Sequence, residues 1–389
     1  MVWSFHSATS LIFGRDAVRQ VGDIAKQHRA TRVFVVTDAV LMKAGIVEQV
    51  HRPLLAAGLT VDIFDAIQPE PTLEMIHTSI DAARRFQPDL IVGLGGGSNI
   101  DAAKLVAIVL AHGKDPTDYT GDCRVPGPVT PLICIPTTAG TGSEVSAAAV
   151  FTDTERKIKV SCLSNYLRPL VAIVDPLLTV SCPPKVTADS GIDALTHAIE
   201  ALTAVDQAEF ESRPPGGETV YQGNNPMADA MAKGCIALVG KFLRRAVRDG
   251  NDLEARDGMA LAATLGGLAF SNAGVALVHA MEYPVGGAVH VSHGAGNGLL
   301  LPYVMRFNRI GRERQFAEIG QLLGSDDVIG TVEQLRIDIG IPTRLRDLGV
   351  TTEMLPDLAD KAFAIKRLLR VNPQMPTRDD ILDIYRNAW

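Results

Sequence analysis

The feature that most restricts the fold of this chain lies in its first half. Short β-branched runs alternate there with amphipathic stretches of helical length. Such alternation is typical of a parallel sheet covered by helices. We therefore predict an α/β fold for this half. The strand-like runs are Arg32–Thr37, Thr60–Phe64, Asp89–Gly93, Pro131–Ile135 and Val171–Val174.

The pattern changes at Cys182-Pro183-Pro184, where two prolines interrupt the chain. Beyond them helical periodicity dominates and almost no strand-like run occurs. A chain of 389 residues also exceeds the usual size of one compact core. We predict an α/β domain at residues 1–182 and an all-helical domain at residues 183–389, with the polar stretch Val205–Asn225 as a loop insertion. The helical patterns are Ser190–Thr203, Met227–Val247, Leu253–Phe270 and Arg312–Leu323.

A glycine-rich turn, Gly95-Gly96-Gly97-Ser98, follows the third strand-like run. Glycines let the backbone approach an anion closely, and a helix N-terminus offers free N–H groups and a partial positive charge. Ser98 and Asp101 have the spacing of a capping box, which predicts the start of a helix here. The turn therefore predicts a phosphate site, and the alternative is a tight strand–helix turn without a ligand.

A second turn, Pro136–Glu144, follows the fourth strand-like run and combines glycines with hydroxyl groups. Clustered hydroxyls and glycines can hold a pyrophosphate or a ribose, although a plain polar loop would have the same composition. The hydroxyl-bearing candidates are Thr137, Thr138, Thr141 and Ser143.

Asp38 lies one residue past the first strand-like run. An acidic residue at a strand end can accept hydrogen bonds from an adenosine ribose and repel a 2′-phosphate. Asp38 therefore predicts NAD rather than NADP, with a helix N-cap or a turn as the alternative.

Four residues of the second half have the character of metal ligands. Asp193 and His197 are four residues apart, so they share one face of a helix. Histidine is scarce, with nine in the chain, yet His279 and His293 lie close together downstream. One carboxylate and three imidazoles without a thiolate suit a catalytic divalent metal such as Fe, Zn or Mn. The alternative for the Asp193–His197 pair is a solvated helix face or a simple hydrogen bond.

Composition excludes several classes of partner. The net charge of −7 argues against nucleic acid and acidic membrane surfaces. No run approaches the roughly 18 apolar residues of a membrane helix, and the first residues lack the features of a signal peptide. The five cysteines show no metal or redox spacing. We therefore expect a cytoplasmic protein with reduced thiols.

Taken together, these motifs resemble the iron-containing (group III) alcohol dehydrogenases, which share a fold with glycerol dehydrogenases and dehydroquinate synthases. The resemblance runs from about Phe13 to at least Asn308. It implies an N-terminal dinucleotide-binding α/β domain, a helical metal-binding domain and an active site in the cleft between them. The matching motifs are Gly95–Lys104, Pro136–Glu144, Val174–Pro176, Gly191–Glu200 and the stretch from His279 to Gly294.

The resemblance also implies the activity and its cofactors. It predicts a homodimer that oxidises a small primary alcohol, or reduces the aldehyde, with NAD and a divalent metal. Fe²⁺ is the expected metal, and Zn²⁺ or Mn²⁺ would fit the same ligands. The predicted metal ligands are Asp193, His197, His279 and His293. The predicted cofactor-binding residues are Asp38, Gly95, Gly96, Gly97, Ser98, Asp101, Thr137, Thr138, Thr141, Ser143 and Lys159, although Lys159 would also suit an exposed strand.

Tyr283 departs from the family pattern. Many members carry a histidine four residues after the third metal ligand, and this chain has Tyr283 there. A phenol with an ordinary pKa near 10 is a poor base at neutral pH, so His290 is an alternative proton relay unless it is a packed histidine. Tyr283-Pro284, Tyr221–Pro226 and Asn272–Val275 resemble the hydroxyacid–oxoacid transhydrogenases, which pass hydride from 4-hydroxybutyrate to 2-oxoglutarate through retained NAD. The short spacing before His293 is nearer to bacterial alcohol dehydrogenases.

Overall fold

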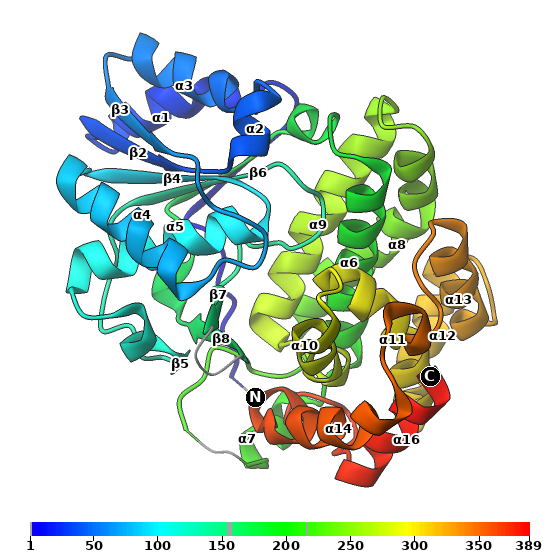
Figure 1. Ribbon diagram of the computed structural model, residues 1–389. Coiled ribbons are helices and arrows are strands. Elements are labelled where there is room, and N and C mark those ends of the chain that lie inside the picture. The colour runs from blue at the N-terminus through cyan, green and yellow to red at the C-terminus, as the bar shows by residue number, and fades with distance from the viewer. Residues whose placement is uncertain (1, 154–157, 215–216) are drawn as a thin grey trace.

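A twisted parallel sheet forms the first half of the molecule, and a group of packed helices forms the second (Figure 1). The computed structural model describes residues 2–153, 158–214 and 217–389. The larger sheet has the strand order β1-β9-β6-β4-β2-β3, and all its pairs are parallel. Its strands are β1 (Ser10–Phe13), β2 (Arg32–Val36), β3 (Thr60–Phe64), β4 (Leu90–Gly95), β6 (Leu132–Pro136) and β9 (Val171–Val174).

Helices cover both faces of this sheet because its strands are apolar on both sides. Phe34 and Val36 of β2 belong to one hydrophobic cluster, whereas Val33 and Val35 belong to the other. Helices α4 and α5 pack on the first face, and α1 and α3 pack on the second (Figure 1). The helices of this half are α1 (Val21–Gln27), α2 (Ala39–Lys43), α3 (Ile46–Ala56), α4 (Leu73–Phe86) and α5 (Gly97–His112).

The five predicted strands are all present, and a strand also occurs at Lys159, where one was considered as an alternative, but the sequence patterns missed three others. The edge strand β1 is short, and its side chains at Leu11 and Phe13 are exposed. A separate three-stranded sheet has the order β5-β8-β7, in which β7 and β8 are antiparallel. Its strands are β5 (Gly121–Asp122), β7 (Ala148–Asp153) and β8 (Ile158–Leu163).

Beyond Pro184 every regular element of the described residues is helical. These helices share one continuous hydrophobic core. The proposed loop insertion is partly helical, because α7 occupies Gln207–Ser212, and residues 215–216 lie outside the described part. The helices are α6 (Pro184–Thr203), α7, α8 (Pro226–Arg248), α9 (Leu253–Ala273), α10 (Leu277–Val289), α11 (His293–Asn308), α12 (Glu313–Leu323), α13 (Val328–Asp338), α14 (Leu355–Ala364), α15 (Lys366–Leu369) and α16 (Arg378–Ala388). Short 3-10 helices lie at Ala17–Gln20, Pro116–Tyr119, Asn165–Leu167, Pro176–Thr179, Leu345–Leu348 and Thr352–Met354.

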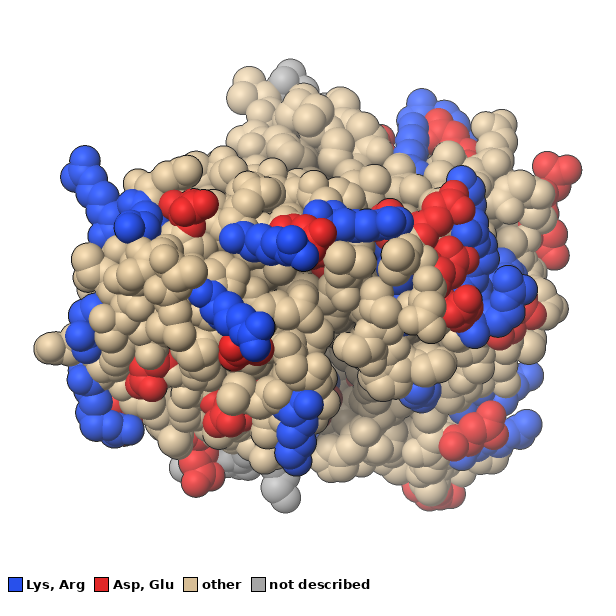
Figure 2. All heavy atoms as spheres, turned by 90° about the horizontal axis from the view of Figure 1, so that it is seen from above, with Lys and Arg blue, Asp and Glu red and all other residues tan. Residues whose placement is uncertain are grey.

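The loop after β6 packs directly against the helical half. A Cβ atom on Gly140 would lie 2.3 Å from the backbone oxygen of Ser190 in α6. A Cβ atom on Gly142, which has a φ of +59°, would lie 2.3 Å from the Cα atom of Gly267 in α9. Only glycine permits such close approaches. The surface seen from above is hollowed between the two halves, and its acidic and basic side chains are interspersed (Figure 2).

Within the described residues, no single helix has the length and apolar character needed to cross a membrane. The pair α9 and α10 reaches that length and composition only together, and it is bent by 105° at its junction. The predicted division into domains at residue 182 stays a prediction.

Candidate metal centre and cofactor site

The two glycine-rich turns lie at neighbouring carboxyl ends of the sheet. Gly95 of β4 pairs with Pro136 of β6, so the turns that follow these strands are adjacent. The order of the strands reverses between β2 and β4, and ligands of open α/β sheets bind outside the carboxyl ends at such a reversal. Asp38 follows β2 at the same edge. The fold therefore assembles the predicted cofactor residues at the position where a dinucleotide is expected.

The turn after β4 has the shape of an anion site. Gly95 has a φ of +144°, and a Cβ atom there would collide with the side chain of Asn99. Gly96 is the N-cap of α5. Because glycine has no side chain, the N–H groups of the first turn of α5 receive no side-chain cap from the N-cap residue. A Cβ atom on Gly97 would lie 3.1 Å from Thr141, which brings the two turns into contact.

The predicted capping box at Ser98 and Asp101 is wrong. The N-cap is Gly96, and the Ser98 hydroxyl instead accepts a hydrogen bond from the Glu70 N–H at 3.3 Å. Asp101 accepts hydrogen bonds from the Ser143 hydroxyl at 2.5 Å and from the Val150 N–H at 3.0 Å. Burial raises the pKa of Asp101. Asp101 and Ser143 therefore bind one another and hold the two turns together.

Asp38 caps a helix and contacts the glycine-rich turn through Asn99. One carboxylate oxygen caps α2 by accepting from the N–H groups of Val40 and Leu41 at 2.8 and 2.9 Å. The other oxygen accepts from the Asn99 amide at 2.6 Å. Asn99, which sequence reasoning missed, also donates to the Leu94 carbonyl at 3.1 Å. The capping alternative is thus observed, and Asn99 places Asp38 beside the glycine-rich turn.

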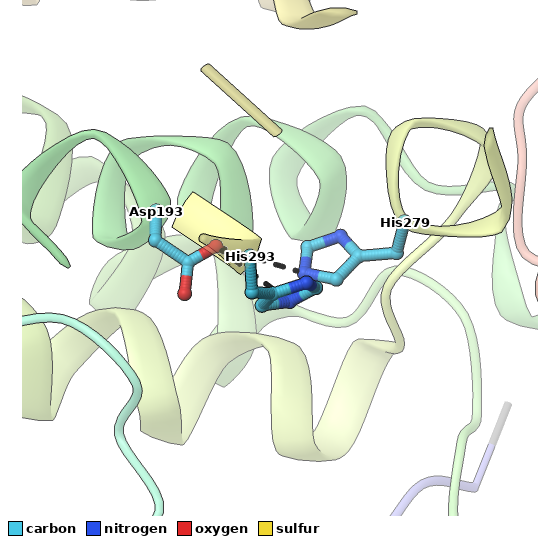
Figure 3. Close-up of side chains that lie close together, drawn as sticks. All are labelled: Asp193, His279 and His293. Atoms are coloured by element: carbon cyan, nitrogen blue, oxygen red, sulfur yellow. Dashed lines mark ion pairs between the residues drawn. The ribbon is translucent and has the colours of Figure 1, made fainter. Parts of the chain in front are cut away.

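Three of the four predicted metal ligands converge in the helical half. The ligand atoms of Asp193 on α6, His279 on α10 and His293 on α11 all lie within 4.8 Å of one another (Figure 3). Asp193 Oδ1 is 3.9 Å from His279 Nε2 and 4.0 Å from His293 Nε2. A Cβ atom on Gly294 would lie 2.0 Å from the backbone oxygen of Asp189, so glycine there lets α11 approach α6 closely. A small contraction of this triangle gives the spacing of a divalent-metal site.

Two buried carboxylates orient the imidazoles. Glu200 Oε2 lies 2.6 Å from His279 Nδ1, and Glu282 Oε2 accepts from His293 Nδ1. Because a carboxylate only accepts, each Nδ1 carries the hydrogen, and in the neutral imidazole each Nε2 directs its lone pair to the triangle. Sequence reasoning gave these carboxylates no role, although Glu200 lies seven residues after Asp193 on one helix face. This donor set fits a divalent metal.

His197 lies beside this group without joining it. Its Nε2 is 3.9 Å from Asp193 Oδ2, and its ring stacks on Phe270 and on His279 at centroid distances of 4.2 and 4.9 Å. Burial lowers the pKa of His197 to about 4. Its Nδ1 is buried without a hydrogen-bond partner among the described residues. His197 is therefore a neutral imidazole within a short movement of the candidate metal site.

The charges of the site counteract its burial. Burial alone would raise the pKa of Asp193, but the neighbouring histidines outweigh it and the pKa is lowered. Burial likewise opposes protonation of His293, but Glu282 and Asp193 outweigh it and raise its pKa. Asp193 is thus an anion ready to bind a cation, and protons compete with that cation for His293.

The remaining predicted residues differ in their distance from the metal ligands. The half-buried Tyr283 ring lies 6.5 Å from the ring of His279 and 5.8 Å from that of His293. Lys159 lies on β8, as the strand alternative suggested, but its side chain is nearly buried rather than exposed and forms an ion pair with Glu70 at 2.6 Å. His290 is exposed at the end of α10, with a φ of +53°. Among the described residues, His290 has no hydrogen bond or ring contact with the metal ligands.

Two family models match the chain. The model described as iron-containing alcohol dehydrogenase matches residues 8–176, and that of the C-terminal part of the Fe-containing alcohol dehydrogenase family matches residues 219–389. The chain belongs to the iron-containing alcohol dehydrogenase family. The match extends to the last residue, well past the stretch of resemblance recognised from the motifs.

Members of this family with known names align over nearly the whole chain. The NAD-dependent methanol dehydrogenase of Bacillus methanolicus is 37% identical over 99% of both chains. The long-chain-alcohol dehydrogenase 1 of Geobacillus thermodenitrificans is 39% identical, over 97% of this chain and 94% of its own length. A crystal structure of 1,3-propanediol oxidoreductase superposes with a TM-score of 0.93 at 35% identity and covers 100% of both chains. The predicted α/β and helical architecture is thus confirmed as that of the family.

Proposed function

We propose that this chain is an NAD- and metal-dependent dehydrogenase that interconverts a small primary alcohol and its aldehyde. The observation that carries the proposal is the convergence of Asp193, His279 and His293, with both imidazoles oriented by buried carboxylates. Family membership and the NAD-dependent relative support the same activity. Fe²⁺ is the metal expected first, with Zn²⁺ or Mn²⁺ as alternatives for the same ligands.

Residues of both halves would hold the cofactors. Asp193, His279 and His293 would bind the metal, with His197 as the fourth ligand after a small shift of its ring. The turns after β4 and β6 would hold the dinucleotide, and the Asp38 carboxylate would disfavour a 2′-phosphate. When bound, the metal polarises the substrate oxygen and NAD accepts the hydride.

The other residues prepare this chemistry. Glu200 and Glu282 hold the Nδ1 hydrogens and so keep both Nε2 lone pairs available. Tyr283 lies against His279 and His293, where its ring excludes water and its hydroxyl can donate to a substrate oxygen. Burial raises the pKa of Tyr283, so the phenol stays protonated and acts as a donor rather than a base. The exposed position of His290 favours Tyr283 for this contact.

A His279→Ala variant tests the proposal. We expect turnover of short alcohols to disappear and metal content to fall, whereas NAD binding measured by fluorescence quenching should be retained. Turnover equal to that of the wild type would refute the metal assignment. The expected homodimer and cytoplasmic location stay predictions, and sedimentation of the purified protein tests the first.

A second candidate is the hydroxyacid–oxoacid transhydrogenase reaction. A carboxylated substrate needs a cation in its pocket, and we propose Arg367 for that role. Arg367 lines a cavity of about 450 Å³, and its guanidinium donates to the Ser161 hydroxyl at 2.8 Å and counteracts the effect of burial on the Tyr283 pKa. Arg124 and Arg370 line the same cavity, as do the acidic residues Asp122 and Glu218.

The two candidates predict different behaviour without added cofactor. Metal-loaded protein is mixed with 4-hydroxybutyrate, and the near-ultraviolet absorbance of reduced nicotinamide is followed. A stoichiometric rise in this absorbance that is reversed by 2-oxoglutarate would favour the transhydrogenase. Arg367→Leu should then weaken turnover of 4-hydroxybutyrate but not of 1-butanol. Turnover of short alcohols that requires free NAD would favour the dehydrogenase.

A further inference from the structure

Asn297 occupies the middle of the candidate metal site. It lies on α11 one turn after His293, and its side chain is fully buried. The amide nitrogen Nδ2 is 2.8 Å from Asp193 Oδ1 and 3.2 Å from the Nε2 atoms of both His279 and His293. No sequence motif pointed to this residue. It touches all three converging ligand atoms.

The chemistry of the ligands determines which end of the amide faces them. Asp193 offers a carboxylate oxygen, and His279 and His293 offer Nε2 lone pairs because their Nδ1 hydrogens are held by Glu200 and Glu282. Three acceptors that face one another repel unless a donor lies between them. The amide nitrogen supplies that donor, and the Asn297 carbonyl oxygen is left buried without a partner. The reverse orientation would add a fourth acceptor to the group.

The Asn297 hydrogens use the lone pairs that a metal would use. In a tetrahedral site with ligand bonds of about 2.1 Å, neighbouring ligand atoms lie about 3.4 Å apart. Asp193 Oδ1 lies farther than that from His279 Nε2 and His293 Nε2, at 3.9 and 4.0 Å, and Asn297 Nδ2 lies 2.8 to 3.2 Å from all three atoms. One lone pair cannot accept a hydrogen bond and bind an ion at once. The amide has two hydrogens for three acceptors, so metal entry has to displace them from whichever two of the ligand atoms they bind.

We propose that Asn297 holds the metal-free ligand set together by hydrogen bonding and competes with the metal for the same lone pairs. This inference rests on the metal assignment of the proposed function. It assigns Asn297 a positioning role that stabilises the metal-free state more than the loaded state. Removing its donor should therefore tighten metal binding, whereas removing a residue that supports the bound metal would weaken it.

The test compares Asn297→Leu with wild type and with Asn308→Leu. Asn308 is a buried asparagine on the same helix, paired with Asn372 at 2.8 Å and without contact to the ligands. Zn²⁺ dissociation constants come from chelator competition, and thermal unfolding is followed with and without Zn²⁺. We expect Asn297→Leu to bind Zn²⁺ about tenfold more tightly, as loss of one hydrogen bond from the metal-free state implies. Its metal-free form should unfold at a lower temperature, and its loaded form should change less.

Equal or weaker Zn²⁺ binding by Asn297→Leu would overturn this role of Asn297. Asn308→Leu should lower the unfolding temperature of both forms alike and leave the Zn²⁺ affinity unchanged. Asn297→Ala, which adds no bulk, is measured in parallel in case the leucine variant does not fold. If wild type does not bind Zn²⁺, or if His279→Ala binds Zn²⁺ as wild type does, the metal assignment itself fails, and the inference fails with it.

Discussion

Glu200 is the residue whose replacement should most clearly separate metal binding from folding. Its carboxylate accepts hydrogen bonds from the Ala276 N–H at 2.9 Å, the Val278 N–H at 2.6 Å and His279 Nδ1 at 2.6 Å. In Glu200→Gln one oxygen becomes an NH₂ group, so in either orientation at least one backbone N–H faces a donor. A buried hydrogen bond to a charged group is worth about 1.5–3 kcal/mol, so we expect the unfolding free energy to fall by about 2–4 kcal/mol.

The same substitution should weaken metal binding about 10–100-fold, because the carboxylate that orients His279 and increases its basicity is lost. Chelator competition with Zn²⁺ measures the affinity, and urea unfolding of the metal-free protein measures the stability. Glu144→Gln is the matched control, since Glu144 is equally buried and accepts from the Thr264 hydroxyl at 3.1 Å, and none of its hydrogen bonds among the described residues goes to a metal ligand. A Zn²⁺ affinity of Glu200→Gln within twofold of wild type would refute the reasoning. An equal loss of Zn²⁺ affinity in Glu144→Gln would show that the weaker binding reflects general destabilisation of the protein.

Three further substitutions test other parts of the structure. Asp38→Asn keeps an oxygen that can cap α2 but removes the charge, so binding of NADP should improve relative to NAD; unchanged selectivity in fluorescence titrations would contradict this. Gly142→Ala should lower the unfolding free energy by more than Gly311→Ala, because both positions have positive φ but only Gly142 touches another backbone; equal losses in urea unfolding would refute the contact. Burial lowers the pKa of His197 from its ordinary value of 6.5 to about 4. Between pH 4 and pH 6.5 the unfolded chain therefore binds more protons than the folded metal-free protein. Its unfolding free energy should therefore fall by about 3 kcal/mol from pH 7 to pH 4 through this residue, and His197→Gln should reduce that slope in urea titrations; identical slopes would refute it.

The sequence predicted those elements whose pattern follows from burial alone. β2 and β4 are buried on both faces between helices, so each is a short continuous apolar run that is easily recognised in the sequence. β1 was missed because it is a short edge strand whose alternate side chains are exposed. The capping box was wrong because Ser98 and Asp101 find partners elsewhere in the chain, and local spacing carries no information about such partners.

The candidate site shows the same limit. Asp193, His279 and His293 could be predicted because histidine is scarce in this chain and Asp193 lies four residues before His197, on the same helix face. Glu200, Glu282 and Asn297 could not, because each acquires its role from a partner on another helix or another turn. An asparagine within an apolar helix has the same appearance in sequence whether it faces an ion or another amide, as Asn308 illustrates.

The distribution of the ligands along the chain has a consequence for how the protein acquires its metal. Asp193 leaves the ribosome long before His279 and His293, and the three atoms meet only after α6, α10 and α11 have packed. A nascent chain therefore has no complete metal site. The folded protein binds its ion from those that are available in the cell at that time. Metal content should follow the supply of the growth medium, so preparations of one sequence from different media can differ in the ion they carry.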